Sequence, residues 1–166
     1  MVGCRSDWRS LGIDGIVPAS SGNPSGKFAL MNINESIQAI LSREKVVADF
    51  FYLTFLDRYP AVQQFFVDVD MQQQNVLLTM GLFIVEQYYR FQYPAIKHYL
   101  RLLGHKHYLR EVPAEMYADW RACLVETLQQ FHGSAWTTGL EAEWNSAIAL
   151  ASQIMLQGYQ ARPKFE

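Results

Sequence analysis

Residues 102–113 read Leu-Leu-Gly-His-Lys-His-Tyr-Leu-Arg-Glu-Val-Pro. Apolar residues upstream of this stretch recur at helical spacing, so a short amphipathic helix is predicted over residues 95–109. Pro113 cannot continue a helix, because it lacks a backbone N–H group and restricts the residue before it. His105 and His107 are two positions apart and therefore lie on different faces of this helix. We expect His105 to be the residue on the surface.

Helical periodicity extends along most of the chain. Prolines separate the apolar runs, and no run shows the strict alternation of a half-buried strand bounded by hairpin signals. The predicted helices lie within residues 33–58 (two helices), 70–90, 95–109, 114–131 and 140–160. The fold class is therefore predicted to be all-α, with about six or seven helices in one domain.

Two details of these helices follow from single residues. Ser42 can cap the N-terminus of the second helix within residues 33–58, because its hydroxyl can accept from free backbone N–H groups. The helix over residues 70–90 has two parallel apolar stripes, one including Val76 and the other Leu78. That helix is therefore predicted to be apolar over a wide arc and largely buried.

The composition suits one compact domain. At 166 residues the chain can bury a sizeable core, and half of its residues are apolar. The formal net charge is −2, so the chain offers no basic field to nucleic acid or to an acidic membrane surface. Its longest apolar runs stop well short of the ~20 residues that span a bilayer. We therefore expect neither nucleic acid nor a membrane as a partner.

The beginning of the chain differs from the remainder. Glycine and proline are concentrated there, so residues 1–30 are predicted to form a flexible N-terminal leader, and residues 31–166 the helical domain. The leader lacks the uninterrupted apolar segment of a secretory signal. Cys4 and Cys123 show neither a disulfide framework nor a metal-binding spacing. Two reduced thiols are expected, together with a cytoplasmic location.

Three stretches resemble the globin family. Residues 51–66 run from an aromatic pair to a proline and then to a phenylalanine six positions later, like the second globin helix and the corner after it. Residues 70–78 resemble the start of the distal helix of bacterial globins, and residues 102–117 resemble their proximal segment, where Leu-Gly-x-x-His precedes a valine and a proline. The resemblance covers roughly residues 33–160. It implies a single-domain bacterial globin, related to the globin domain of flavohaemoglobins and to sensor globins, with its helices around a haem pocket.

The resemblance also implies a cofactor and a set of site residues. Haem b (iron protoporphyrin IX) would be held by one imidazole, which leaves the opposite iron position open to oxygen or nitric oxide. His107 matches the position of the iron ligand, and Tyr52 and Gln74 match the distal positions that face the gas. The hydroxyl and the amide are both able to donate hydrogen bonds to it. The remaining cofactor-binding positions implied by the resemblance are Phe66, Leu78, Val112 and Tyr117.

The position of Gln74 has an alternative. A gapless count from Phe66, as in flavohaemoglobins, would put Val76 in its place and would leave Tyr52 as the only donor. We prefer Gln74 together with Leu78, because the apolar residues that follow Leu78 on the same stripe then match apolar haem contacts of related single-domain globins. The two other histidines, His98 and His132, have no motif around them and are expected to be solvated.

The chain departs from flavohaemoglobins at one position. Those proteins carry a glutamate in the last helix that polarises the proximal histidine, and alignment from Trp144 puts that position near Tyr159. No acidic residue occurs between Glu143 and Glu166, and these 166 residues include no flavin or nicotinamide domain. The resemblance to a self-contained dioxygenase is therefore weakened.

Three functions are consistent with these observations. The first is reversible binding of oxygen or nitric oxide. The second is nitric oxide dioxygenation with electrons from an external reductase, and the third is a gas-sensor or scaffold module. Phycobiliproteins share the helical scaffold and are the structural alternative, but they attach their pigment through a cysteine in an aspartate-rich context, which Cys123 lacks.

Overall fold

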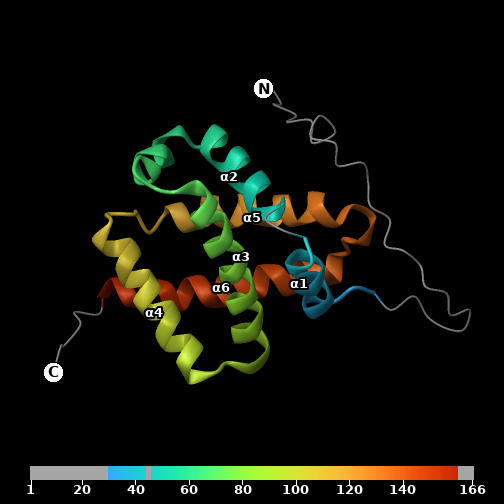
Figure 1. Ribbon diagram of the computed structural model, residues 1–166. Helices are drawn as coiled ribbons and strands as arrows, with labels where there is room; N and C mark the ends of the chain where they lie inside the picture. The colour runs from blue at the N-terminus through green and yellow to red at the C-terminus, as the bar shows by residue number, and fades with distance from the viewer. Residues whose placement is uncertain (1–29, 44–45, 161–166) are drawn as a thin grey trace, which may run out of the picture. The chain divides into compact units, whose positions relative to one another are not determined.

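The computed structural model describes residues 30–43 and 46–160, so the predicted leader lies outside the described residues except for Leu30. The described residues form six α-helices and two short 3₁₀-helices, and they contain no strand (Figure 1). The prediction of an all-α fold is confirmed. None of the helices in this part of the chain is both long enough and apolar enough to cross a membrane.

The α-helices are α1 (Ile33–Leu41), α2 (Val46–Arg58), α3 (Met71–Phe91), α4 (Pro94–Leu109), α5 (Met116–His132) and α6 (Thr138–Gln160). The 3₁₀-helices are η2 (Pro60–Phe66) and η3 (Gly133–Ala135). Proline occupies the first turn of both η2 and α4, where its missing N–H group leaves no hydrogen bond unmade.

Side-chain caps determine where α1 begins and ends. The Asn32 side chain accepts hydrogen bonds from the backbone N–H groups of Asn34 and Glu35, and the Glu35 carboxylate accepts from the N–H of Asn32. Ser42 lies at the other end, where its hydroxyl donates to the carbonyl of Ala39. The prediction that Ser42 begins the second helix is therefore wrong, because its side chain reaches back to α1.

Only one of the two apolar stripes of α3 is buried. Leu78, Leu82 and Val85 pack into the core, whereas Val76 is 47% exposed and Met80 is 45% exposed. The prediction of a largely buried helix is wrong for this second stripe. The reason is tertiary: α3 packs against α1, α2, α4 and α6, and these neighbours leave one of its faces in solvent.

The most extensive helix pair is α4 with α6 (Figure 1). Two glycines allow these helices to approach closely. A Cβ atom on Gly104 would overlap the backbone carbonyl of Met155, and one on Gly158 would overlap the backbone carbonyl of Arg101. This crossing brings the end of α6 beside the end of α4, where His107 lies.

The core is formed by large apolar side chains from all six α-helices. Those that are almost completely buried are Ile37, Ile40, Phe51, Leu82, Leu100, Leu124, Leu128, Leu140, Trp144 and Ile148. The arrangement leaves one mostly apolar cavity among α2, η2, α3, α4, α5 and α6. That cavity contains the candidate site.

Candidate functional site

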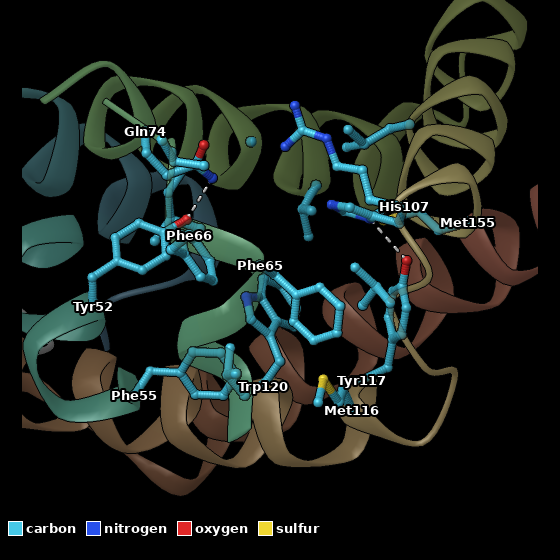
Figure 2. Close-up of a pocket in the computed structure, with 18 of the residues that line it drawn as sticks. Tyr52, Phe55, Phe65, Phe66, Gln74, His107, Met116, Tyr117, Trp120 and Met155 are labelled. Atoms are coloured by element: carbon cyan, nitrogen blue, oxygen red, sulfur yellow. Dashed lines mark hydrogen bonds between the residues drawn. The ribbon is translucent and has the colours of Figure 1, made fainter. Parts of the chain in front are cut away.

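The cavity has a volume of about 210 Å³ and is lined mainly by apolar and aromatic side chains (Figure 2). It brings together all the residues that were predicted to form the site: Tyr52, Phe66, Gln74, Leu78, His107, Val112 and Tyr117. These residues come from α2, η2, α3, α4, the turn after α4, and α5. Three sequence stretches that are separated along the chain therefore meet at one site.

Tyr52 and Gln74 form the polar pair on one side of the cavity (Figure 2). The Gln74 amide nitrogen Nε2 donates to the Tyr52 hydroxyl oxygen at 2.8 Å. The Tyr52 ring is 6% exposed and packs edge-on against Phe66, with the ring centroids 5.5 Å apart. Burial raises the pKa of Tyr52 to about 12, although the hydrogen bond from Gln74 opposes this shift. The phenol is therefore protonated at neutral pH.

The geometry also distinguishes the two registers considered for α3. Gln74 and Leu78 both line the cavity, while Val76 and Met80 do not and are exposed on the outer side of the helix. The capping of α3 contributes to this orientation, because the Asp70 carboxylate accepts from the backbone N–H groups of Gln72 and Gln73 and starts the helix at Met71.

His107 lies on the opposite side of the cavity from Tyr52 (Figure 2). Its Nδ1 atom is 3.0 Å from the hydroxyl oxygen of Tyr117. Burial, and then the nearby charge of Arg110, lowers the pKa of the imidazole, so the ring is neutral at neutral pH. Its other ring nitrogen, Nε2, has no hydrogen-bond partner among the described residues. A neutral imidazole with an unengaged nitrogen at an apolar cavity has the properties of a metal ligand.

Tyr117 and Tyr159 extend this side of the site away from the cavity. Their rings pack edge-on with centroids 6.1 Å apart, and the Tyr159 hydroxyl donates to the carbonyl oxygen of Val112 at 2.9 Å. Burial, and then the hydroxyl of Tyr159, raises the pKa of Tyr117 well above its usual value. His107 is therefore hydrogen-bonded to a neutral phenol.

Several lining residues were not among the predicted site residues. Phe65, Trp120 and Met155 contribute apolar wall (Figure 2), and Arg110 is the only formally charged side chain among the described residues that line the cavity. The apolar periodicity predicted that α5 and α6 are helices. It did not predict which of their apolar residues face the cavity. Arg110 could have been suspected from its place three residues after His107, which puts it on the same side of the chain one turn later.

The other three histidines lie in different surroundings. His98 is exposed, as expected. His105 is half-buried with its Nδ1 3.3 Å from the carbonyl oxygen of Gly158, so it is not a simple surface residue. The prediction that His132 is solvated is wrong, because its Nε2 lies 2.7 Å from the hydroxyl of Ser36 and its ring stacks on Trp136. None of these three lines the cavity.

Comparison with known families gives one match. A sequence model of the family described as Globin matches residues 49–155, which is more than half of the chain and includes α3, α4 and α5 in full. Comparison with curated proteins finds no match. The family match and the all-helical fold agree with each other and with the resemblance noted in the sequence. The chain belongs to the globin family.

Proposed function

We propose that this chain binds haem b through His107 and reversibly binds a diatomic gas, oxygen or nitric oxide, beside Tyr52 and Gln74. One observation carries the proposal. The neutral imidazole of His107 and the hydrogen-bonded pair of Tyr52 and Gln74 lie on opposite sides of a single apolar cavity. A haem site needs an iron ligand on one side of the haem and hydrogen-bond donors for the gas on the other. His107 and the Tyr52–Gln74 pair supply these on opposite sides of the cavity.

The residues present fit haem. Nε2 of His107 is free to ligate iron, because Nδ1 is the ring nitrogen that contacts Tyr117. Phe66, Leu78 and Val112 supply apolar wall for the macrocycle, and Arg110 is the charged group available to its carboxylates. When bound, haem would supply an iron atom with one coordination position open to a diatomic gas.

The donor pair is arranged to hold a polar ligand. Because the Gln74 amide donates to the Tyr52 oxygen, the phenol keeps its own proton for another acceptor. The raised pKa of Tyr52, about 12, keeps that proton in place throughout the physiological pH range. A donated hydrogen bond contributes about 1 kcal/mol net, and more toward a charged acceptor, which slows release of the ligand by roughly tenfold.

Nitric oxide dioxygenation with an external reductase is the second candidate. The Tyr52–Gln74 pair favours it as much as it favours simple binding, since both need a donor beside the gas. On the other side, His107 contacts the phenol of Tyr117, which increases the electron donation of an imidazole less than a carboxylate partner does. This contact favours the gas-binding function. A sensor or scaffold role would need a partner chain to carry the signal. The cytoplasmic location is a separate prediction, made from the cysteine spacing.

Titration of the purified full-length chain with haem tests the proposal. We expect a sharp haem absorption band that saturates at one haem per chain and shifts reversibly on addition and removal of oxygen. Failure to acquire this band would contradict haem binding and would leave the scaffold role.

The second candidate function, nitric oxide dioxygenation, is tested by measuring nitrate formation from oxygen and nitric oxide, first with a nicotinamide cofactor alone and then with an added flavin reductase. We expect no sustained turnover without the reductase, and sustained turnover by the isolated chain would contradict the gas-binding function.

A further inference from the structure

Gly81 is the middle residue of α3, a position where glycine weakens a helix. Glycine loses more conformational freedom on folding than alanine does, so in a helix interior it raises the equilibrium constant for unfolding roughly two- to fivefold relative to alanine. Two reasons commonly explain such a glycine. The backbone adopts an angle that other residues avoid, or a neighbouring segment leaves no room for a side chain.

Neither reason applies to Gly81. Among the described glycines, the positive φ angle is found at Gly133. A Cβ atom on Gly81 would meet no heavy atom within 4 Å outside its own stretch of helix, whereas one on Gly104 or Gly158 would overlap the backbone of the facing helix. Helix packing therefore explains Gly104 and Gly158 but leaves Gly81 unexplained.

The open space beside Gly81 belongs to the cavity of the candidate site, because Gly81 is one of the residues that line it. Leu78 and Val85 lie three residues before and four residues after Gly81, so all three share one face of α3, and both neighbours line the cavity as well. Between these two branched side chains, the cavity wall at Gly81 consists of helix backbone.

We propose that Gly81 determines the ligand specificity of the cavity, because it leaves room for the edge of a flat tetrapyrrole macrocycle against the backbone of α3. The inference rests on the proposed function, in which the same cavity binds haem. A macrocycle is rigid and cannot bend around a side chain that stands in its way, whereas a diatomic gas can avoid one. Overpacking a close-packed site typically changes an equilibrium constant by roughly 5- to 150-fold.

The first test is urea denaturation of the full-length chain without haem. Gly81→Ala should lower the equilibrium constant for unfolding roughly two- to fivefold, because the added Cβ meets open space. Gly104→Ala is the contrasting variant and should raise this constant, since its Cβ would overlap the backbone of Met155. A less stable Gly81→Ala chain would overturn the proposal, because the fold itself would then require glycine at this position.

The second test is binding of metal-free protoporphyrin IX, which has the macrocycle of haem b but no iron for His107 to ligate. Binding is followed by quenching of tryptophan fluorescence, since Trp120 lines the cavity. We expect Kd to rise several-fold in Gly81→Ala and at least tenfold in Gly81→Leu.

The matched control for porphyrin binding is Gly139→Leu, the same substitution at a residue of α6 that does not line the cavity. A Cβ atom on Gly139 would contact only the Thr137 hydroxyl oxygen, at 3.7 Å, so this variant should bind the porphyrin like the wild type. A folded Gly81→Leu chain that binds as tightly as the control would overturn the proposal. If Gly81→Leu does not fold, Gly81→Ala decides, and an unchanged Kd there would overturn it.

Haem binding by the same variants and by His107→Ala separates the role of Gly81 from the proposed function. Gly81→Leu should weaken the binding of both haem and metal-free porphyrin, whereas His107→Ala should lose haem and keep the porphyrin. If His107→Ala keeps both in full, the proposed iron ligand is wrong and the role of Gly81 stands. If Gly81→Leu binds both like the wild type, the role of Gly81 fails and the proposed function stands. A wild type that binds neither would overturn both.

Discussion

His107 and His132 are both half-buried imidazoles that stay neutral at neutral pH, yet their surroundings differ. Burial lowers the pKa of each, and that of His132 falls to about 4, with the charge of Arg43 as a second cause. His132 has a nitrogen engaged by the Ser36 hydroxyl at 2.7 Å and a ring that stacks on Trp136, whereas His107 keeps one nitrogen free at a cavity. A lowered pKa shows only that a histidine is neutral. Whether the histidine could ligate a metal depends on whether one of its two ring nitrogens is left without a partner.

The network around His132 joins three helices. The indole N–H of Trp144 donates to the Ser36 oxygen at 2.9 Å, and the same oxygen lies 2.7 Å from Nε2 of His132. Ser36 is completely buried, and it lies on α1, while Trp144 lies on α6 and His132 ends α5. These residues do not line the cavity that contains the candidate site. The role of His132 is therefore structural.

The largest expected effect comes from the helix crossing that supports His107. Gly158→Ala should destabilise the fold by on the order of 3 kcal/mol or prevent folding, because its Cβ would meet the backbone carbonyl of Arg101, which cannot move aside. Gly139→Ala, on the same helix, meets only the Thr137 hydroxyl oxygen at 3.7 Å and should leave stability unchanged or slightly raised. Urea denaturation of both variants measures the difference. Equal effects would mean that α4 and α6 do not approach as closely as described.

Acid should weaken the His132 network. The folded pKa, about 4, is below the unfolded value of 6.5, so the unfolded chain takes up a proton first as the pH falls. The stability contributed by neutral His132 is present above pH 6.5 and is lost between there and pH 4, by on the order of 2 kcal/mol for this partly exposed group. His132→Gln can keep a hydrogen bond to Ser36 but does not titrate, so it should lose less stability than the wild type, by the same amount, over this pH range. His98→Gln, at an exposed histidine, is the control and should follow the wild type.

A smaller effect is expected on the gas side of the cavity. Tyr52→Phe removes the free phenol proton and keeps the ring, so oxygen should leave the haem-loaded chain roughly tenfold faster, while carbon monoxide should respond less. Tyr88→Phe is a matched control, because Tyr88 is also buried, at 4% exposed, but does not line the cavity. Stopped-flow release rates measure both variants. An unchanged oxygen rate in Tyr52→Phe would remove Tyr52 from the proposed site.

Local sequence patterns predicted most of the fold. Apolar spacing and proline positions indicated the helices, because the residues on the buried face of a helix recur every three or four positions in the sequence. The motif stretches led to Tyr52, Gln74 and His107, which the fold does bring to one cavity. That these residues bind haem and gas remains a prediction.

The features that the sequence did not reveal all depend on distant partners. Ser36 and His132 are 96 residues apart, and Tyr159 and Val112 are 47 residues apart. The exposure of Val76 likewise depends on which helices pack around α3. No local sequence pattern predicts contacts between residues so far apart in the sequence, because these contacts depend on how the helices cross.

The most direct test of the account is haem stoichiometry in histidine variants of the full-length chain. His107→Ala should lose stable haem binding while its circular dichroism remains helical, and added imidazole should restore part of the absorption band by occupying the space of the missing ring. His105→Ala and His132→Gln should each still bind one haem per chain. A His107→Ala chain that keeps its haem while His105→Ala loses it would contradict the assignment of His107 as the iron ligand.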